Sequence, residues 1–251
     1  MKISVITATW NSEETIEATL RSLNTQDYSD IEHIIVDGAS TDATLDSVRR
    51  HGDRVNAVIS EKDNGIYEAL NKGINAATGD VIGFLHSDDL YANQNVLSRI
   101  AKEFTNDGTD ATYSDLDYVS KTNVNKTVRS WVSGGFDRSK MKNGWMPPHP
   151  TFYMRREHYG ALGGFDLKYM IAADYDSMLR YLWKNKLNPS YIPEVLVKMR
   201  LGGKSNNSFS NILKKITEDK NAMIENGIHP LSGLLGKNFS KIPQFLMCRL
   251  H

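Results

Sequence analysis

The chain has 251 residues, of which 40% are hydrophobic and 24% charged, a composition typical of a soluble globular protein with one sizeable core. Lysine plus arginine and aspartate plus glutamate both total 30, so the charge balance gives no reason to expect a nucleic-acid partner, and we expect none. The single cysteine, Cys248, excludes an internal disulfide and a cysteine-based zinc site. The sequence shows no secretory signal and no 18-residue apolar stretch, so we expect a cytoplasmic protein.

The first 90 residues alternate between short apolar runs and amphipathic segments. The apolar runs are rich in β-branched residues and predict strands, while the segments between them begin with residues that can cap a helix. This alternation predicts a doubly wound, mostly parallel α/β sheet with helices on both faces. The expected strands are Ile3–Ala8, Ile31–Val36, Val55–Ser60 and Val81–Leu85, and the expected helices are Asn11–Leu23, Thr41–His51 and Ile66–Ala77.

After Asp89 the predicted elements are shorter and less regular. The segment Lys121–Lys142 carries six Lys or Arg residues and one acid, and could be either a lid over an anionic acceptor or a solvated loop. We predict one catalytic domain over residues 1–205, with a nucleotide-binding half (1–90) and an acceptor half (91–205), followed by a helical tail (206–251). The expected elements are helices at Ala92–Phe104, Arg155–Leu162, Asp174–Lys186 and Phe209–Asn226, strands at Ala111–Ser114, Thr151–Met154 and Tyr191–Met199, a β-ribbon of Leu116–Ser120 with Lys126–Val132, and a loop at Ser133–Asn143.

The stretch Gly79–Asp89 combines a buried strand with two adjacent carboxylates, Asp88 and Asp89, where the chain leaves the sheet. Ligands bind at the carboxyl ends of strands in open α/β sheets. Two hard oxygen donors at such an edge suit a divalent cation, Mn²⁺ or Mg²⁺, that holds a diphosphate. Asp and Ser are also common turn residues, so a purely structural turn is the alternative.

The position of the glycines separates several nucleotide-binding folds. Gly38 is the first glycine, so the first strand–helix turn, Ala8–Ser12, has none. The dinucleotide fingerprint and the P-loop need glycines at this turn for close approach to phosphate, and both are therefore excluded. The same absence disfavours sugar nucleotidyltransferases, and no Gly-x-Ser-x-Gly elbow occurs. The phosphates must then be held in another way, and a carboxylate-bound metal is the obvious substitute.

Five blocks of sequence, taken together, resemble the family-two inverting glycosyltransferases of the GT-A fold. The resemblance covers roughly residues 1–180, and the order and spacing of the blocks make it specific where each block alone would be weak. The blocks are Thr7-Ala8-Thr9-Trp10-Asn11, Val36-Asp37-Gly38-Ala39-Ser40-Thr41-Asp42, Asp63-Asn64-Gly65-Ile66-Tyr67-Glu68-Ala69-Leu70-Asn71-Lys72-Gly73, Gly79–Asp89, and Ala173-Asp174-Tyr175-Asp176 with Arg180.

This resemblance implies a nucleotide-sugar donor, a UDP-sugar in the first instance, bound over the N-terminal half. The backbone of Thr7, Ala8 and Thr9 would then line the nucleobase. Asp37 and Asp63 would contact the base or the ribose. Each acid has a structural alternative, because Asp37 could cap the turn that follows it and Asp63 could be a turn residue before Asn-Gly.

The same resemblance assigns the chemistry. Asp88 and Asp89 would hold the metal, with Asp89 as the direct ligand, and Asp174 would be the general base that deprotonates the acceptor hydroxyl. Lys72 would contact the ribose or a phosphate, or else lie on a solvated helix face. We favour Asp174 over Asp176, which should face elsewhere on the helix.

Some positions depart from the family pattern. Ala173 stands where many relatives have Glu, and Gly38 stands where many have a second Asp, which weakens the inference to uracil. The region directly after the last strand, Arg200–Ser205, contains no His to complete the metal site, and Lys204 could interact with the diphosphate instead. His149 is a candidate on the acceptor or phosphate side, with a hydrogen-bonded structural histidine as its alternative. His86, on a strand beside the carboxylates, should point away from at least one of them.

The sequence gives the least information about the acceptor and about the C-terminal tail. The segment Phe239–Leu250 combines large apolar residues with cations and has no acid, so we expect peripheral contact with an anionic membrane, with packing on the body or on a partner as the alternative. We predict a non-processive enzyme, since the Gln-x-x-Arg-Trp motif of polymer synthases is absent. A lipid-linked saccharide in bacterial polysaccharide synthesis, such as a polyprenyl-diphosphate sugar, is the expected acceptor. The rival functions are a sugar nucleotidyltransferase and a non-catalytic nucleotide-sugar-binding protein.

Overall fold

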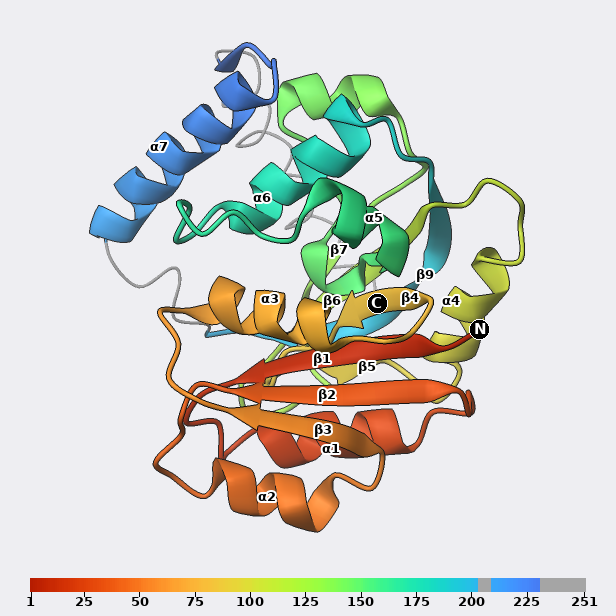
Figure 1. Ribbon diagram of the computed structural model, residues 1–251, viewed down its shortest axis with the longest axis vertical. Helices are drawn as coiled ribbons and strands as arrows, with labels where there is room; N and C mark the ends of the chain where they lie inside the picture. The colour runs from red at the N-terminus through yellow and green to blue at the C-terminus, as the bar shows by residue number, and fades with distance from the viewer. Residues whose placement is uncertain (203–208, 231–251) are drawn as a thin grey trace.

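One mixed sheet divides the molecule into layers, with helices packed on both of its faces (Figure 1). The computed structural model describes residues 1–202 and 209–230. Within those residues the strands form one nine-stranded sheet in the order β3-β2-β1-β4-β8-β6-β9-β5, and β7 pairs with β6 beside that path. The predicted α/β class, with a mixed central sheet flanked by helices, is confirmed.

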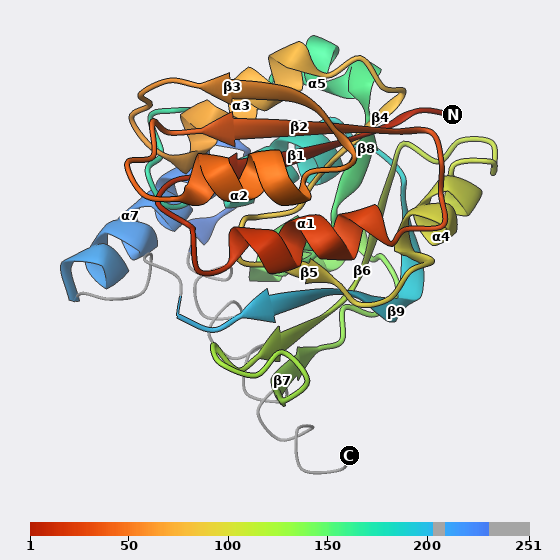
Figure 2. The same ribbon diagram turned by 90° about the horizontal axis from the view of Figure 1, so that it is seen from below.

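The N-terminal half is the regular part of the fold. Its strands pair in parallel, β3 with β2, β2 with β1 and β1 with β4. The helices α1 and α2 cover one face of these strands and α3 covers the other (Figures 1 and 2). The elements are β1 (Ile3–Thr9), α1 (Ile16–Asn24), β2 (Ile31–Asp37), α2 (Thr44–His51), β3 (Val55–Ser60), α3 (Ile66–Ala76) and β4 (Val81–Phe84).

Strand β2 shows how the sequence produces these layers. Successive side chains of a strand point to opposite faces of the sheet. Ile34 and Val36 accordingly pack in the core cluster that contains α3, while Ile35 between them packs with α1 and α2. An unbroken apolar run is therefore what a strand covered on both faces requires.

The C-terminal half extends the same sheet with shorter elements. Strand β8 is antiparallel to both β4 and β6, and β9 is parallel to β6. Strands β6 and β9 consequently run in the same direction as β1 to β4. The elements are β5 (Leu90–Tyr91), α4 (Val96–Glu103), β6 (Ala111–Val119), β7 (Thr127–Trp131), the 3₁₀ helices η1 (Arg138–Asn143) and η2 (His149–Thr151), β8 (Tyr153–Arg155), α5 (Arg156–Leu162), α6 (Ala173–Met178), the π-helical η3 (Leu179–Lys184), β9 (Pro189–Arg200) and α7 (Phe209–Glu225).

The predicted elements were placed well in the first 90 residues and less well afterwards. The predicted β-ribbon is confirmed as the β6–β7 hairpin. The predicted loop Ser133–Asn143 is wrong in its second half, which forms η1 with an Asp137 cap and a left-handed Gly144 at its end. The predicted helix Asp174–Lys186 changes to π-helical geometry at Leu179.

Gly83 explains why the strand before the two carboxylates contains a glycine. A Cβ atom at this position would lie 2.0 Å from Cε1 of Tyr153 on the neighbouring strand β8, far inside van der Waals contact. The tyrosine ring therefore lies directly over the β4 backbone, and its hydroxyl is 2.6 Å from that of Tyr91 on β5. This close packing holds the strands that lead into and out of the Asp88–Asp89 turn.

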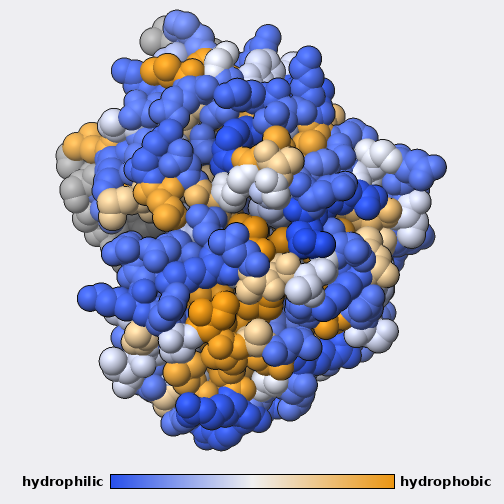
Figure 3. Space-filling view, in the orientation of Figure 1, coloured by the Kyte–Doolittle hydropathy of each residue, from blue (hydrophilic) through white to orange (hydrophobic). Residues whose placement is uncertain are grey.

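Helix α7 is part of the main body of the protein. Its Ala222 and Met223 are fully buried in the largest core cluster, together with Ile228 just beyond the helix. The predicted boundary at residue 205 falls among residues that the structure does not describe, as does the predicted membrane segment Phe239–Leu250. Among the described helices, none has the length and apolarity needed to cross a bilayer. The face seen in Figure 3 is mainly hydrophilic, with apolar side chains gathered near edge strand β3, where Val58 is 48% exposed.

His33 in β2 gives the fold a predicted sensitivity to acid. Its ring is fully buried with Nε2 3.0 Å from Oγ1 of Thr7, and burial lowers the pKa of His33 to about 3 from the ordinary 6.5. The unfolded chain therefore takes up a proton below about pH 6.5 that the folded chain excludes until about pH 3. We expect the free energy of unfolding to fall through this window by up to about 1.4 kcal/mol per pH unit from this residue.

Urea unfolding between pH 4 and pH 8 would measure that slope. The variant His33→Gln should reduce it by about one proton, whereas His51→Gln, at a partly exposed histidine, serves as the matched control. Equal slopes for the wild type and His33→Gln would contradict the assignment.

Candidate functional site

The topology brings six strand ends to one edge of the sheet. The carboxyl ends of β1 to β4 meet there because these strands are parallel, and β6 and β9 end at the same edge because they run in the same direction. The turn with Asp88 and Asp89 follows β4, and the register places Val119 of β6 beside Arg200 of β9. Antiparallel pairing of Leu90 with Lys198 brings the end of β9 next to the two carboxylates.

Asp88 and Asp89 lie in a tight turn whose geometry leaves the second carboxylate enclosed. The main-chain N–H of Asp89 donates to the carbonyl of His86 at 3.0 Å, and the hydroxyl of Thr19 on α1 donates to the carbonyl of Asp89 at 2.8 Å. The Asp89 side chain is fully buried, yet within residues 1–202 and 209–230 neither of its carboxylate oxygens makes a hydrogen bond of ordinary geometry, although the main-chain N–H of Arg200 is near enough to lower its pKa. Burial, and next the charge of Asp88, raise the pKa of Asp89 well above its usual range, and nearby Arg200 offsets part of this effect.

The donor set fits a divalent cation. An ionised carboxylate without partners in the interior is costly unless a cation compensates it, and oxygen ligands are those that Mg²⁺ and Mn²⁺ prefer. Asp88 is partly exposed and could be a second oxygen ligand. In the described ranges no group of three or more His, Cys, Asp or Glu side chains is suitably arranged for a metal. The remaining ligands would have to come from substrate or water.

Asp174 lies in the first turn of α6 and is only partly buried. One of its carboxylate oxygens accepts from the N–H of Tyr175 at 2.8 Å and from the hydroxyl of Tyr67 at 3.3 Å. Tyr67 also donates to the carbonyl of Ile171 at 2.8 Å, and burial, followed by the charge of Asp174, raises the pKa of this phenol well above 10. Tyr67 on α3 thus holds the carboxylate from the N-terminal half of the chain.

Asp176, two residues later, has a different environment. Its carboxylate is buried and accepts from Nε of Arg180 at 3.1 Å and from the amide of Asn226 at 3.0 Å. The guanidinium of Arg180 also donates to main-chain carbonyls at the end of α5. Asp176 therefore joins three elements of the fold and, as predicted, does not share the position of Asp174.

The loop before Asp174 is held by a residue far along the chain. Glu218 of α7 is buried, and its carboxylate accepts three main-chain N–H groups, from Met170 at 3.2 Å, Ile171 at 2.8 Å and Ala172 at 3.0 Å. The N-cap of α6 is Ala172, which has no side chain able to cap the helix. Glu218 supplies from another helix the acceptor that the local sequence lacks.

We expect Glu218→Ala to destabilise the protein by about 3 kcal/mol, because three buried N–H groups would lose a charged acceptor. The turnover number should fall with little change in donor affinity, since the loop leads to Asp174 and not to the turn after β4. Thermal unfolding and steady-state kinetics would measure both effects. Glu218→Gln should be milder because its amide oxygen can still accept, and the exposed Lys220→Ala on the same helix is the control. An unchanged turnover number in folded Glu218→Ala would contradict this role.

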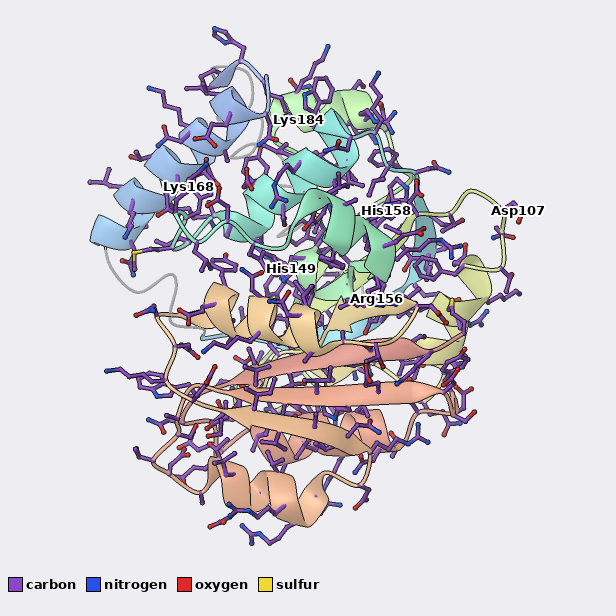
Figure 4. The ribbon with its side chains drawn as sticks, in the orientation of Figure 1. Asp107, His149, Arg156, His158, Lys168 and Lys184 are labelled. Carbon is purple, nitrogen blue, oxygen red and sulfur yellow. The ribbon has the colours of Figure 1, made fainter. Side chains whose placement is uncertain are left out.

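Two neighbouring histidines, His86 and His149, follow and flank the end of β4 near Asp88. The charges of Asp88 and Asp174 both act on the ring of His86, so this imidazole is within electrostatic reach of each. The ring centroid of His149 is 5.7 Å from that of His86, and both ring nitrogens of His149 are buried without a partner. Burial lowers the pKa of His149 to about 3, and Figure 4 shows this residue in the interior between α3 and the layer of α5 and α6. His149 is therefore enclosed behind His86.

The predicted nucleoside positions form a second cluster at the ends of β1 to β3. Asp37 is fully buried and accepts from Ser40 and from the hydroxyl of Ser60 at 2.7 Å. Asp63 accepts from the N–H of Gly65 at 3.0 Å, and its other oxygen would be 2.8 Å from a Cβ atom at Gly38. The structure thus brings Asp37 and Asp63 to the same edge of the sheet. Each of them also makes the contacts of a turn residue, which was the predicted alternative to ligand binding. Their donor contacts remain predictions.

Other predicted donor-binding residues have mixed surroundings. The hydroxyl of Thr7 is hydrogen-bonded to His33, and Ala8 is buried. The hydroxyl of Thr9 is enclosed and has no hydrogen-bond partner among the described residues. The carbonyl of Thr9 accepts from the N–H of Gly38. The Nζ atom of Lys72 forms ion pairs with Glu61 at 3.0 Å and with Glu68 at 3.3 Å. These contacts favour the alternative in which Lys72 lies on a solvated helix face. Lys204 lies outside the described residues.

Several residues at this edge were not predicted from the sequence. Arg200 lies beside Asp89, and its Nε is buried with no partner, although another nitrogen donates to the carbonyl of Lys121. The guanidinium of Arg129 stacks on the ring of Tyr118 at 3.8 Å, and the charges of Asp89 and Asp174 both act on that phenol. The position of Arg200 at the end of the last predicted strand was the one available signal.

The basic segment Lys121–Lys142 is not simply a solvated loop, since it contains β7 and η1, and its role as a lid over an acceptor stays a prediction. Arg129 is part of β7 and stacks on Tyr118, as described above. Arg138 donates to the carbonyls of Leu182 at 2.8 Å and Leu187 at 3.1 Å and so ties η1 to the end of η3. Part of the positive charge of this segment therefore has structural roles.

Comparisons with known proteins show the family of this chain. Residues 4–165 match the family model described as glycosyl transferase family 2. A PGL/p-HBAD biosynthesis glycosyltransferase of Mycobacterium bovis is 31% identical over 209 residues, which cover 81% of this chain and 78% of that protein. The amylovoran biosynthesis glycosyltransferase AmsB of Erwinia amylovora is 28% identical over 204 residues, with 72% and 64% covered.

Solved structures share the fold at low sequence identity. Residues 1–349 of S. aureus TarS superpose with a TM-score of 0.69 at 20% identity, over 99% of this chain and 71% of that one. The mannosyltransferase PcManGT of Pyrobaculum calidifontis, in complex with GDP-Man and Mn²⁺, gives 0.67 at 18% identity, over 98% and 73%. The chain spans 44% of the longer TarS chain. On the family match and the fold together, this chain belongs to glycosyl transferase family 2 and is a glycosyltransferase of the GT-A fold.

Proposed function

We propose that this chain transfers one sugar at a time, with inversion and with the help of a divalent metal, from a nucleotide-sugar donor to an acceptor hydroxyl. The observation that carries the proposal is that the pair Asp88 and Asp89, and the separate carboxylate of Asp174, act on the same neighbouring groups. Asp88 and Asp174 both act on His86, and Asp89 and Asp174 both act on Tyr118. This shared electrostatic environment supports one site in which Asp88 and Asp89 bind the metal and Asp174 is the base.

The residues of the chain account for the main steps. Asp174 accepts the proton of the acceptor hydroxyl, since its carboxylate is fixed by Tyr67 and partly open to solvent. Asp89, with Asp88, would hold Mn²⁺ or Mg²⁺, and the bound cation would stabilise the negative charge of the departing diphosphate. Arg200 adds a positive group at the same position. Base and leaving-group positions on different elements support a single displacement, which inverts the anomeric carbon.

The donor we propose is a UDP-sugar. TarS has been solved with UDP and with UDP-GlcNAc, and PcManGT with GDP-Man and Mn²⁺, so proteins of this fold bind such donors. In this chain Asp37, Asp63 and the main chain of Thr7 to Thr9 would hold the nucleoside. The missing side chain of Gly38 leaves the space that the Asp63 carboxylate occupies. Selection of the nucleobase would therefore depend on Asp63 and not on an acid at position 38.

The acceptor we propose is a lipid-linked saccharide of a bacterial polysaccharide pathway, reached at the inner face of the cell membrane. Relatives named for PGL/p-HBAD and amylovoran biosynthesis support an acceptor of the cell-surface glycan class. The expected membrane contact rests on the apolar and basic sequence of Phe239–Leu250.

Removal of residues 231–251 should lower binding to vesicles that contain anionic lipid, because apolar and cationic side chains are lost together. Sedimentation with vesicles of phosphatidylcholine with and without phosphatidylglycerol would measure this effect. The full chain is the reference, and UDP binding by the shortened chain checks that its fold is intact. Equal vesicle binding by both chains, with equal activity on a lipid-linked acceptor, would overturn the membrane part of the proposal.

The test of the function combines structure and chemistry. A crystal soaked with UDP and Mn²⁺ should show the metal on Asp89 and the base near Asp63. A screen of UDP- and GDP-sugars with candidate acceptors, scored on nucleoside diphosphate release, should identify the donor. Release of pyrophosphate from a sugar phosphate and UTP would instead favour a nucleotidyltransferase, and binding without turnover of any donor would favour a non-catalytic protein.

A further inference from the structure

We propose that an apolar and basic surface beside the edge where β1 to β4 end binds the anionic face of a membrane. The surface, called the rim below, consists of the first half of α7 and the loop that precedes α6. Its exposed apolar side chains are Leu167, Met170, Ile212, Leu213 and Ile216, and its cations are Lys214 and Lys215. The inference rests on the proposed function and deepens it, by naming the surface through which a lipid-linked acceptor is reached.

The rim gathers large apolar side chains that remain in water. Each of its five apolar side chains is between 44% and 64% exposed. Residues three and four positions apart are neighbours on a helix, so Ile216 of α7 lies next to both Ile212 and Leu213. Exposed apolar side chains that occur singly are ordinary, whereas a contiguous group of them marks a surface that binds a partner.

Two contacts join the loop and the helix into one surface. Nζ of Lys214 on α7 lies 2.7 Å from Sδ of Met170 in the loop. The main-chain N–H of Met170 donates to the carboxylate of Glu218, one turn further along α7, at 3.2 Å. The exposed side chain of Met170 is therefore fixed beside the first half of α7, and the rim is continuous.

The charge of the rim favours an anionic partner. The segment Phe209–Thr217 contains Lys214 and Lys215 and no acid. Neither lysine forms an ion pair within residues 1–202 and 209–230. Apolar side chains flanked by lysines match a bilayer, in which negative headgroups lie over acyl chains.

The same charge disfavours a second copy of this chain as the partner. A symmetric contact through the rim would bring the same surface patch of both copies together. Lys214 and Lys215 of one copy would then face those of the other, and like charges repel. An anionic membrane satisfies the apolar side chains and the lysines at once.

The rim lies on the side of the molecule that carries the candidate site. Figures 1 and 2 show the N-terminal end of α7 on the side to which the arrowheads of β1 to β3 point. Met170 also lies only four residues before Asp174 in the chain. A bilayer against the rim would therefore present a lipid-linked acceptor on the side of the proposed base.

Sedimentation of the full chain with vesicles would measure the contact. The vesicles are phosphatidylcholine alone and phosphatidylcholine mixed with phosphatidylglycerol. The variant Ile212→Gln/Leu213→Gln/Ile216→Gln should bind the mixed vesicles at least about tenfold more weakly, because three apolar side chains no longer enter the interface. Lys214→Gln/Lys215→Gln should also lower binding to the mixed vesicles about tenfold, and binding to phosphatidylcholine by less than about twofold.

Two variants elsewhere on the surface are the matched controls. Val58→Gln replaces an exposed apolar side chain of β3. Arg49→Gln/Lys102→Gln removes the same positive charge as the lysine variant, from exposed positions on α2 and α4, which lie away from α7 (Figure 1). Each control should change vesicle binding by less than about twofold. All of these variants keep residues 231–251, so their effects are separate from that of the tail.

Four results would overturn the inference. They are no binding of the wild type to mixed vesicles, equal binding by the wild type and both rim variants, equal losses in rim variants and controls, and a rim variant that changes only the oligomeric state seen by light scattering. The vesicle measurement needs no turnover. Absence of transfer with every donor would therefore reject the proposed function, whereas vesicle binding alone decides this inference.

Discussion

Replacement of Asp174 by Asn should lower the turnover number by about 10²- to 10⁴-fold while donor affinity remains close to that of the wild type. The amide keeps the shape of the side chain and an oxygen that can accept from Tyr67 and from the N–H of Tyr175, so the local structure should persist. It cannot take a proton from the acceptor hydroxyl, which is the step assigned to this residue. Nucleoside diphosphate release with the true acceptor, and calorimetry with the donor, would measure the two quantities.

Asp176→Asn is the matched control for this result. Asp176 lies on the same helix two residues away, but its carboxylate is buried against Arg180 and Asn226. Its replacement should lower thermal stability and affect the turnover number much less than Asp174→Asn does. Full turnover by Asp174→Asn, or an equal loss in both variants, would show that the base is elsewhere.

Replacement of Asp89 by Asn should have opposite effects on stability and on ligand binding. In the absence of metal, the buried carboxyl group has no partner of ordinary hydrogen-bond geometry among the described residues and lies near the charge of Asp88. Its replacement by an amide should raise the metal-free stability by about 1 to 3 kcal/mol, because folding no longer buries a group that the unfolded chain ionises freely in water. The same change should abolish the Mn²⁺-dependent part of donor binding, because the direct ligand is lost.

Thermal unfolding with increasing Mn²⁺ would test both effects together. The wild type should be stabilised by the metal in proportion to its occupancy, and Asp89→Asn should not respond. Asp88→Asn provides the control, because Asp88 is partly exposed and its replacement should bring little gain in metal-free stability. A metal response that survives in Asp89→Asn would place the ligand at another residue.

The sequence predicted the N-terminal half of the fold because the signals there are local. Runs such as Ile31–Val36 are apolar on both faces and bounded by turn residues, and the observed β2 extends only one residue further, to Asp37. The order of the sequence blocks then pointed to the family, which the comparisons confirm. The structure adds that the charges of Asp88 and Asp174 both act on His86 and that those of Asp89 and Asp174 both act on Tyr118.

The residues that were missed depend on contacts between distant parts of the chain. Arg200 reaches Asp89 because β5 pairs with β9, and a two-residue strand such as Leu90–Tyr91 leaves almost no trace in sequence. Glu218 looks like an ordinary charged residue of an amphipathic helix, and only the docked position of α7 shows its three acceptor contacts. The π-helical turn that follows α6 likewise results from packing rather than from local propensity.

The support that Glu218 of α7 gives to the loop before Asp174 has a consequence for the order in which the protein matures on the ribosome. The parallel strands β1 to β4, which lead to Asp37, Asp63 and Asp89, emerge first and can form their sheet from contacts among themselves. Asp174 emerges next, but the loop before it acquires its acceptor only when Glu218 has been synthesised, 44 residues after Asp174. A nascent chain would therefore become competent to bind a nucleotide before it becomes competent to transfer a sugar.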